Sequence, residues 1–207
     1  VGELLVGIAV LRLGVGFEDA VFKLPFDLLD LRLPRVDVGA FGILAIIHEA
    51  EKFGLPCDVV DDLTGARLGR AKSGTFRTTD VVGLDTVQHV LKTMQDTLQD
   101  DPFYPLFKTP DVVSGLIAAG SLGQKSGAGF YKKVGKEVQR IDFTSGEYVA
   151  AGGKGDEAVI RLLKEKDPLK RMTGLRESTH PQAQFLWAIF RDAFHYIAVH
   201  LAEIADN

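Results

Sequence analysis

Two loops of this 207-residue chain concentrate lysine, hydroxyl and glycine residues. The first is GRAKSGTFRTTDVVGLD, residues 69–85, and the second is SLGQKSGAGFYKK, residues 121–133. Small residues in such loops let a ligand approach the backbone closely. The second loop also suits a purely architectural role, because Gly127 and Gly129 permit tight turning. Among the lysine, hydroxyl and glycine residues of the two loops are Lys72, Ser73, Gly74, Thr75, Lys125 and Ser126.

The glycine spacing does not predict a dinucleotide site. A dinucleotide-binding fingerprint, G-x-G-x-x-G, follows a strand and opens a helix, whose N-terminus then meets the pyrophosphate. Gly123, Gly127 and Gly129 instead precede a predicted strand. Residues 152–154 have the lysine of a P-loop but neither its first glycine nor its hydroxyl residue. We therefore predict no cofactor-binding residue in this sequence.

The histidines form no constellation for catalysis or metal binding. His48 would need a second histidine four residues further along its helix, and Lys52 stands there. His195 and His200 are five residues apart, which places them on different faces of a helix. His89 is expected in solvent. We predict no catalytic residue and no metal ligand among them.

Composition limits the classes of partner. A chain with 46% hydrophobic and 25% charged residues is typical of a globular domain, and its net charge of −4 disfavours nucleic acid and anionic lipid. A local basic patch could still bind the phosphates of a small ligand. The uncharged run from Leu4 to Leu11 is far shorter than the ~20 residues of a membrane span. The single cysteine, Cys57, excludes an intrachain disulfide and favours a buried thiol and a cytoplasmic location.

Helical periodicity dominates the elements that must position the two loops. One helix is predicted over residues 39–53, ending at Gly54. A second is predicted from Asp80 to Leu98, capped by one of residues 78–80, so that Asp80 and Asp85 are interpreted as capping groups rather than acids. A third covers residues 109–120.

The later part of the chain is predicted to differ. Residues 129–149 alternate aromatic and β-branched residues with turn signals, which indicates a small antiparallel meander of two or three strands. Two short helices follow, over residues 156–166 and 168–176, and a long helix covers residues 181–205. The aromatic residues of this last helix fit either the core or a contact with a partner: Phe185, Trp187 and Phe194.

The two loops, in this order and spacing, resemble the C-terminal helical domain of 3-hydroxyacyl-CoA dehydrogenases. The second loop fits the family phrase G-x-L-G-x-K-[ST]-G-x-G-F-Y. Thr75 replaces a proline that is usual in the first loop. The D-x-L-T-G phrase that contains Asp62, Leu63, Thr64 and Gly65 is similar to the segment that links the family's first helix to this loop. The fixed positions of the first loop are occupied by Gly74, Phe76, Asp80, Gly83, Leu84 and Asp85.

The resemblance implies a mainly α fold, a helical bundle like the C-terminal domain of 6-phosphogluconate dehydrogenase, with a small antiparallel β meander. It divides the chain into an atypical segment over residues 1–36 and a first helical repeat over residues 37–133. A connector over residues 134–180 and the first helix of a truncated second repeat, residues 181–207, would follow. The relatives with two such repeats are long bacterial forms, related to the multifunctional enzymes of fatty-acid oxidation.

The implied function is the substrate-binding and dimerisation portion of an NAD-dependent 3-hydroxyacyl-CoA dehydrogenase of fatty-acid β-oxidation. In the family, a separate dinucleotide-binding half carries NAD and a His-Glu pair for proton transfer. Nothing here resembles that half, and residues 35–37 read Arg-Val-Asp where relatives have an asparagine at the catalytic cleft. The expected partners are an acyl-CoA, which residues 72–75 and 125–126 would contact, the dinucleotide-binding domain and a second copy. The chain alone is expected to bind no NAD and to be inactive. The alternative is a non-catalytic oligomerisation or interaction module of a β-oxidation complex.

Overall fold

A computed structural model describes residues 38–205 of the chain. The predicted atypical segment over residues 1–36 lies outside the described residues. Within residues 38–205, no helix is both long enough and apolar enough to cross a membrane.

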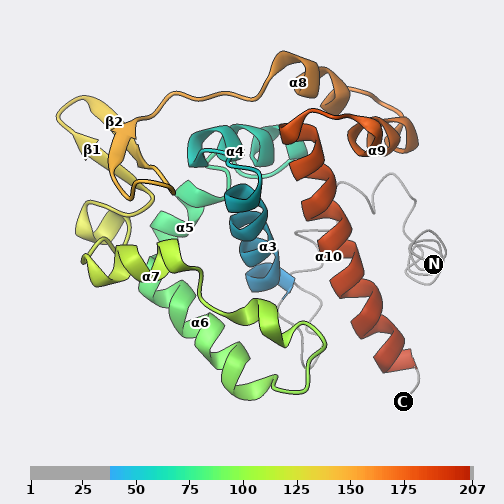
Figure 1. The fold of residues 1–207 in the computed structure, drawn as a ribbon, viewed down its shortest axis with the longest axis horizontal. Coiled ribbons are helices and arrows are strands. Elements are labelled where there is room, and N and C mark those ends of the chain that lie inside the picture. Colours follow the sequence, from blue (N-terminus) through green and yellow to red (C-terminus); the bar gives the residue numbers. More distant parts are fainter. Residues whose placement is uncertain (1–37, 206–207) are drawn as a thin grey trace.

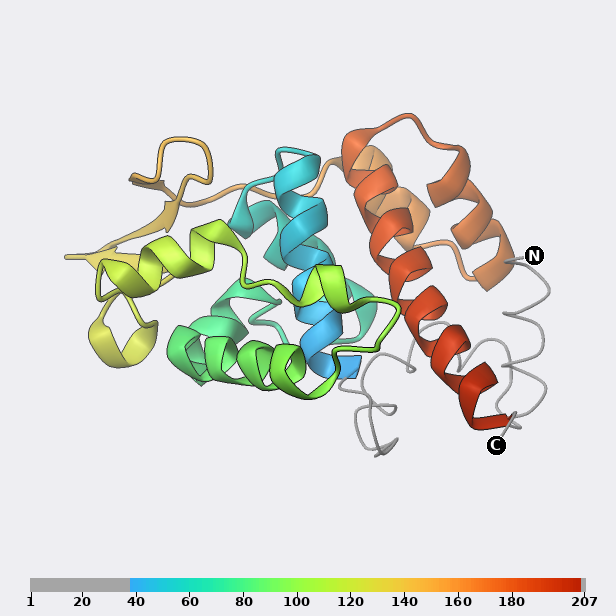
Figure 2. The same ribbon diagram turned by 60° about the horizontal axis from the view of Figure 1, so that its bottom comes forward.

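Two long helices form the centre of the fold. Helix α3, Val38–Lys52, lies alongside the 25-residue helix α10, Pro181–Ala205, although more than a hundred residues separate them in sequence (Figures 1 and 2). Both helices were predicted nearly at these bounds. Gly54 follows α3 with a φ of +62°, which is the left-handed conformation expected at a helix C-terminus.

Short helices carry the first loop. Helix α4, Cys57–Thr64, and the 3₁₀ turn η2, Ala66–Leu68, precede it, and α5, Phe76–Val82, begins within it. Helix α6, Leu84–Thr97, then begins after a sharp break. The prediction of one helix from Asp80 to Leu98, capped by residues 78–80, was wrong. Those residues lie inside α5, and Gly83, with a φ of +99°, separates the two helices because few other residues adopt that conformation.

The second loop leads from a helix into a sheet. The 3₁₀ turn η3, Tyr104–Phe107, precedes helix α7, Asp111–Ala118, and the turn η4, Gln124–Ser126, lies in the loop itself. The strands β1, Tyr131–Val134, β2, Glu137–Ile141, and β3, Tyr148–Ala150, pair antiparallel in the order β1-β2-β3. Tyr131 of β1 lies opposite Arg140 of β2. The mainly α fold with a small antiparallel meander is therefore confirmed.

Two short helices connect the sheet to α10. They are α8, Glu157–Leu163, and α9, Pro168–Glu177, close to the predicted ranges. Each is capped by an aspartate: Asp156 accepts a hydrogen bond from the N–H of Ala158 at 2.8 Å, and Asp167 accepts one from that of Leu169 at 2.9 Å.

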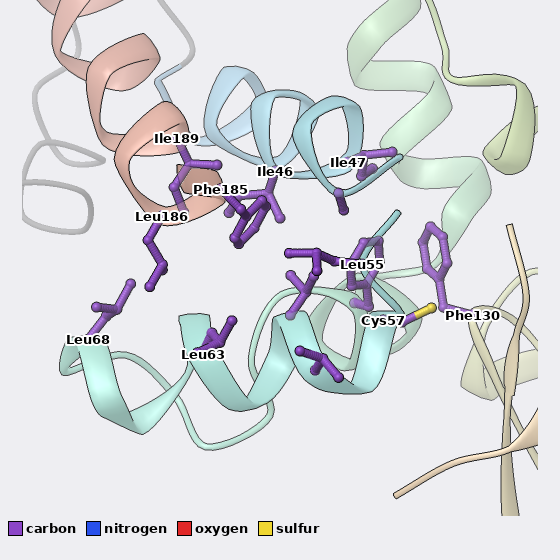
Figure 3. Packing of buried hydrophobic residues seen from close by; sticks show 14 of the residues in the cluster. Ile46, Ile47, Leu55, Cys57, Leu63, Leu68, Phe130, Phe185, Leu186 and Ile189 are labelled. Atoms are coloured by element: carbon purple, nitrogen blue, oxygen red, sulfur yellow. The ribbon is translucent and has the colours of Figure 1, made fainter. Parts of the chain in front are cut away.

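The main hydrophobic core lies where α3, α4 and α10 meet. Figure 3 shows Ile46 and Ile47 of α3 facing Leu63 of α4, with Phe185 of α10 between them. Cys57 is fully buried in this core, as predicted, and burial raises the pKa of its thiol far above the usual range. A second cluster joins α3 to α6, η3 and α10. It includes Phe41, Leu91, Met94, Phe103, Phe107 and Tyr196.

The aromatic residues of α10 that had two interpretations pack on the core. Phe185 is fully buried, and Trp187 and Phe194 are partly buried against the main cluster. The core interpretation therefore accounts for Phe185 outright. The remaining exposed surface of Trp187 and Phe194 leaves part of α10 open to solvent.

Candidate functional site

The first loop is fastened to α4 by one buried carboxylate. Asp61 Oδ1 accepts hydrogen bonds from the backbone N–H groups of Thr75 and Phe76, both at 2.7 Å. Its Oδ2 accepts one from the N–H of Arg77 at 3.1 Å and one from the Tyr131 hydroxyl at 2.7 Å. A side chain of α4 thus satisfies the free N–H groups at the start of α5, which α5's own N-cap residue does not do.

The close approach predicted at Gly74 is made by α4. A Cβ on Gly74 would lie 2.6 Å from the Asp61 Cα, and its φ is +70°, so no other residue fits easily. Thr75 is also buried, and its hydroxyl lies 3.0 Å from that of Thr64. Gly74 and Thr75 therefore form the buried side of the first loop, which packs against α4.

Lys72 and Ser73 form the accessible part of the first loop. Lys72 is exposed. Ser73 is half-buried, and its Oγ lies 2.7 Å from the Thr78 Oγ1 in the first turns of α5. Of the four residues predicted here, these two present side-chain polar atoms on the surface.

A second carboxylate, Asp80, ties α5 to the start of the sheet. It accepts hydrogen bonds from the N–H groups of Phe130 and Tyr131, both at 2.8 Å. Its predicted role as a helix cap was wrong, because it lies in the last turns of α5 and its acceptors face β1. Burial raises its pKa to about 6, against the lowering effect of these two hydrogen bonds.

The glycines of the second loop make room for Asp80. A Cβ on Gly129 would lie 2.1 Å from Asp80 Oδ1, and one on Gly123 would lie 2.3 Å from the Asp80 carbonyl oxygen. Gly123 also has a φ of +102°. Protein atoms therefore fill the inside of this glycine loop.

Lys125 and Ser126 have local partners. Lys125 Nζ lies 2.6 Å from Oδ2 of Asp85, in the first turn of α6, and this hydrogen bond lowers the pKa of Asp85. Ser126 Oγ accepts a hydrogen bond from the N–H of Leu122 at 2.7 Å and donates to the Ala128 carbonyl at 2.9 Å. These contacts stabilise the second loop. Both side chains are nevertheless exposed, so they remain accessible to solvent.

Sequence reasoning missed α4 and its other carboxylates. Asp58 Oδ2 accepts the N–H groups of Gly152 and Gly153 at 2.8 and 2.7 Å, and Asp62 Oδ2 accepts that of Gly155 at 3.0 Å. Burial alone would raise the pKa of Asp58, but these glycine hydrogen bonds, the charge of Arg140 at 3.1 Å and the N–H of Val59 together outweigh it, and the pKa is lowered. The signal available in sequence was the helical spacing of apolar residues within CDVVDDLT, just after Pro56.

His200 has a clear structural role. It is buried, its Nε2 lies 2.8 Å from Asp101 Oδ2, and its Nδ1 lies 2.8 Å from the Tyr196 carbonyl. This contact joins α10 to the segment after α6. His89 is exposed, as predicted. No group of three or more His, Cys, Asp or Glu residues between residues 38 and 205 is arranged to hold a metal.

The glycine loop does not fit the pyrophosphate of a dinucleotide. Such a group needs free backbone N–H groups at the start of a helix. Here the N–H groups of Phe130 and Tyr131 are bonded to Asp80, and the chain continues into antiparallel strand β1.

The helical domain, with its two loops fastened on α5, agrees with what the family comparison finds. Residues 43–133 match the family described as 3-hydroxyacyl-CoA dehydrogenase, C-terminal domain. The chain therefore contains a C-terminal domain of the 3-hydroxyacyl-CoA dehydrogenase family. Both loops lie within the matched residues.

Two individual relatives are each described as a probable 3-hydroxyacyl-CoA dehydrogenase. The chain is 35% identical over 170 residues to a probable 3-hydroxyacyl-CoA dehydrogenase of Bacillus subtilis, covering 82% of this chain and 21% of that protein. It is 42% identical over 108 residues to a protein of the same description from Deinococcus radiodurans, covering 52% and 30%. It thus spans less than a third of the length of either curated relative. No solved structure gave a significant match.

The pH dependence of stability should report the buried carboxyl of Asp80. An acid whose pKa is raised in the folded state keeps a proton that the unfolded chain has already released, so folding loses stability as pH rises from about 4 to about 6. In Asp80→Asn this titration is absent. We expect the unfolding free energy of wild type minus that of Asp80→Asn to fall as pH rises over that range and to stay constant above it. Urea unfolding followed by circular dichroism would measure both free energies, and a signed difference that rises with pH would contradict the assignment.

Proposed function

We propose that the chain supplies the helical, substrate-side domain of a cytoplasmic NAD-dependent 3-hydroxyacyl-CoA dehydrogenase of fatty-acid β-oxidation. The observation that carries this proposal is that Asp61 of α4 holds the first loop at the start of α5, and Asp80 of α5 holds the end of the second loop, all within the family-matched residues. Loops held this way keep a fixed geometry, as a substrate-positioning surface requires.

In this proposal the hydride and proton transfers belong to a dinucleotide-binding domain elsewhere in the protein. Residues 38–205 contribute exposed polar atoms at Lys72, Lys125 and Ser126 and half-buried ones at Ser73, where a thioester or its pantetheine arm would lie. The relatives' greater length leaves room for such a domain.

The test is calorimetric titration of the 207-residue chain with 3-hydroxybutyryl-CoA, with coenzyme A and with NAD. We expect the thioester and coenzyme A to bind without turnover and NAD not to bind. Micromolar binding of NAD would contradict the assignment of the cofactor to another domain. Failure of both coenzyme A compounds to bind would contradict the substrate role.

A second candidate function is an interaction module. Val81 and Val82, at the junction of α5 and α6, are 61% and 51% exposed, which suits contact with another protein surface. Sedimentation separates the two functions. A monomer that binds 3-hydroxybutyryl-CoA supports the substrate role, and a dimer indifferent to it supports the interaction module.

We also propose that α10 begins a second helical repeat, equivalent to α3 in the first. Both are long helices with apolar residues on several faces, and they pack against each other. In this arrangement α3 and α10 would form the seam between the two repeats, and a homodimer would use other surfaces.

A further inference from the structure

Positive charge is concentrated in the two loops and the strand that follows. Residues 64–79 and 112–136 contain basic residues and no acidic ones, although the whole chain has a net charge of −4. The basic residues of these two segments are Arg67, Arg70, Lys72, Arg77, Lys125, Lys132, Lys133 and Lys136. Such an uneven distribution creates a local positive field.

Several of these charges have no acidic partner. Arg67 pairs with Asp62 and Lys125 pairs with Asp85. In the part of the chain that the structure describes, ion pairs are absent for five exposed residues, namely Lys72, Arg77, Lys132, Lys133 and Lys136. The charge of Arg77 also lowers the pKa of the buried Asp80, and the charges of the exposed lysines are available to an anionic ligand.

Arg77 occupies a rigid position among them. Its guanidinium carbon lies 4.2 Å from the centre of the Tyr131 ring, so α5 and β1 meet here, as Figure 1 also shows. Tyr131 is held in turn by Asp61 through its hydroxyl and by Asp80 through its N–H. A guanidinium that stacks on a ring keeps its N–H edge free to bind a phosphate.

Lys133 shares this face of the sheet. It is two residues after Tyr131 in β1, so both side chains leave the strand on the same side, roughly 7 Å apart along it. Arg77, over the Tyr131 ring, and Lys133, on the same side of β1, are therefore two cations on one face of the strand. Lys72, in the loop before α5, and Lys136, between β1 and β2, add to the positive potential, whereas Lys132 leaves β1 on the opposite side and its Nζ lies 5.4 Å from the centre of the Tyr148 ring.

We propose that Arg77 and Lys133 form a subsite for the phosphates of the 3′-phospho-ADP portion of a coenzyme A thioester. The inference rests on the proposed function, which brings an acyl-CoA to these loops. A small nucleotide fits better than a polyanion, because the basic face is short and the remainder of the chain is net negative.

The experiment uses the full chain and the double variant Arg77→Gln/Lys133→Gln. Calorimetry would measure affinity for coenzyme A, 3′-dephospho-CoA, NAD and 3-hydroxybutyryl-N-acetylcysteamine, which has the thioester without the nucleotide. We expect the double variant to lose about tenfold in affinity for coenzyme A, the loss typical of a charge-assisted contact. Its preference for coenzyme A over 3′-dephospho-CoA should disappear, and binding of the truncated thioester should not change.

The matched control is Lys164→Gln/Lys170→Gln, which removes the same charge from exposed residues of the α8–α9 region, away from β1 (Figure 1). An equal loss in this control would overturn the subsite, since net charge alone would then explain the effect. The subsite would also be overturned if Arg77→Gln/Lys133→Gln bound coenzyme A as tightly as wild type does. That result would not contradict the proposed function. If wild type bound NAD as tightly as coenzyme A, with the same loss in the variant, the assignment to coenzyme A would be wrong.

If the proposed function were wrong, wild type would bind neither coenzyme A nor the truncated thioester. Thermal unfolding of each variant shows whether lost affinity reflects lost structure. Arg77→Lys provides a further check. Lysine keeps the positive charge but lacks the planar guanidinium that lies over the Tyr131 ring. The affinity of Arg77→Lys for coenzyme A should therefore lie between those of wild type and Arg77→Gln.

Discussion

Asp61→Asn is expected to destabilise the folded chain by about 3 kcal/mol at neutral pH. The Asp61 carboxylate accepts three backbone N–H groups and the Tyr131 hydroxyl in a buried position. An amide has one acceptor oxygen, and its NH₂ group would face donors. At least one N–H at the start of α5 would therefore lose its partner, and a buried unsatisfied donor costs about 1–3 kcal/mol. Chemical denaturation followed by circular dichroism would measure the loss.

Two variants calibrate this result. Asp96→Asn makes the same change at an exposed residue of α6 and should alter stability by less than about 0.5 kcal/mol. Tyr131→Phe removes one of the four donors and should cost about 1 kcal/mol. If Asp61→Asn were no worse than Asp96→Asn, the carboxylate would not fasten the loop as described.

Gly129→Ala is expected to destabilise the chain by about 2–3 kcal/mol and to weaken binding at the second loop. The new Cβ would lie 2.1 Å from Asp80 Oδ1 and 2.7 Å from the Gly123 Cα. Asp80 cannot simply move away, because it would break its hydrogen bonds to Phe130 and Tyr131. Stability is measured by denaturation, and the exchange rates of the Phe130 and Tyr131 amides should rise.

Gly115→Ala is the matched control. A Cβ there would meet nothing within 4 Å, and Gly115 lies inside helix α7. Alanine is favoured over glycine in a helix by up to about 1 kcal/mol, so this variant should be neutral or stabilising. A Gly129→Ala protein as stable as Gly115→Ala would show that the loop does not pack on Asp80.

Together, Asp61→Asn and Gly129→Ala test the buried contacts that hold α5 in place below the proposed binding surface. Asp61 and Asp80 both act on α5, one at its beginning and one near its end. Loosening either contact should move Lys72, Arg77 and Lys133 relative to one another. Coenzyme A binding is therefore expected to weaken in both variants, in proportion to the structural loss.

The elements that local pattern predicts well are those with long, regular periodicity. The helices at residues 38–52 and 181–205 and the meander were predicted because apolar spacing, capping residues and turn glycines agreed. Helix α4 was missed because it is short and carries three aspartates, Asp58, Asp61 and Asp62, which suggest a loop. The break at Gly83 was missed because the apolar spacing continues across it.

The sequence by itself determined the family resemblance, the mainly helical fold and the two loops, since these depend on residue types at fixed local spacing. Only the tertiary structure decided what the residues of those loops do. The donors to Asp61 lie 14 to 16 and 70 residues away, and those to Asp80 lie 50 and 51 residues away. Contacts over such separations depend on how helices pack, which local spacing does not record. For that reason Gly74 and Thr75 proved to form the buried side of the first loop, and Arg77 of α5 came to lie over the ring of Tyr131 in β1, 54 residues away in sequence.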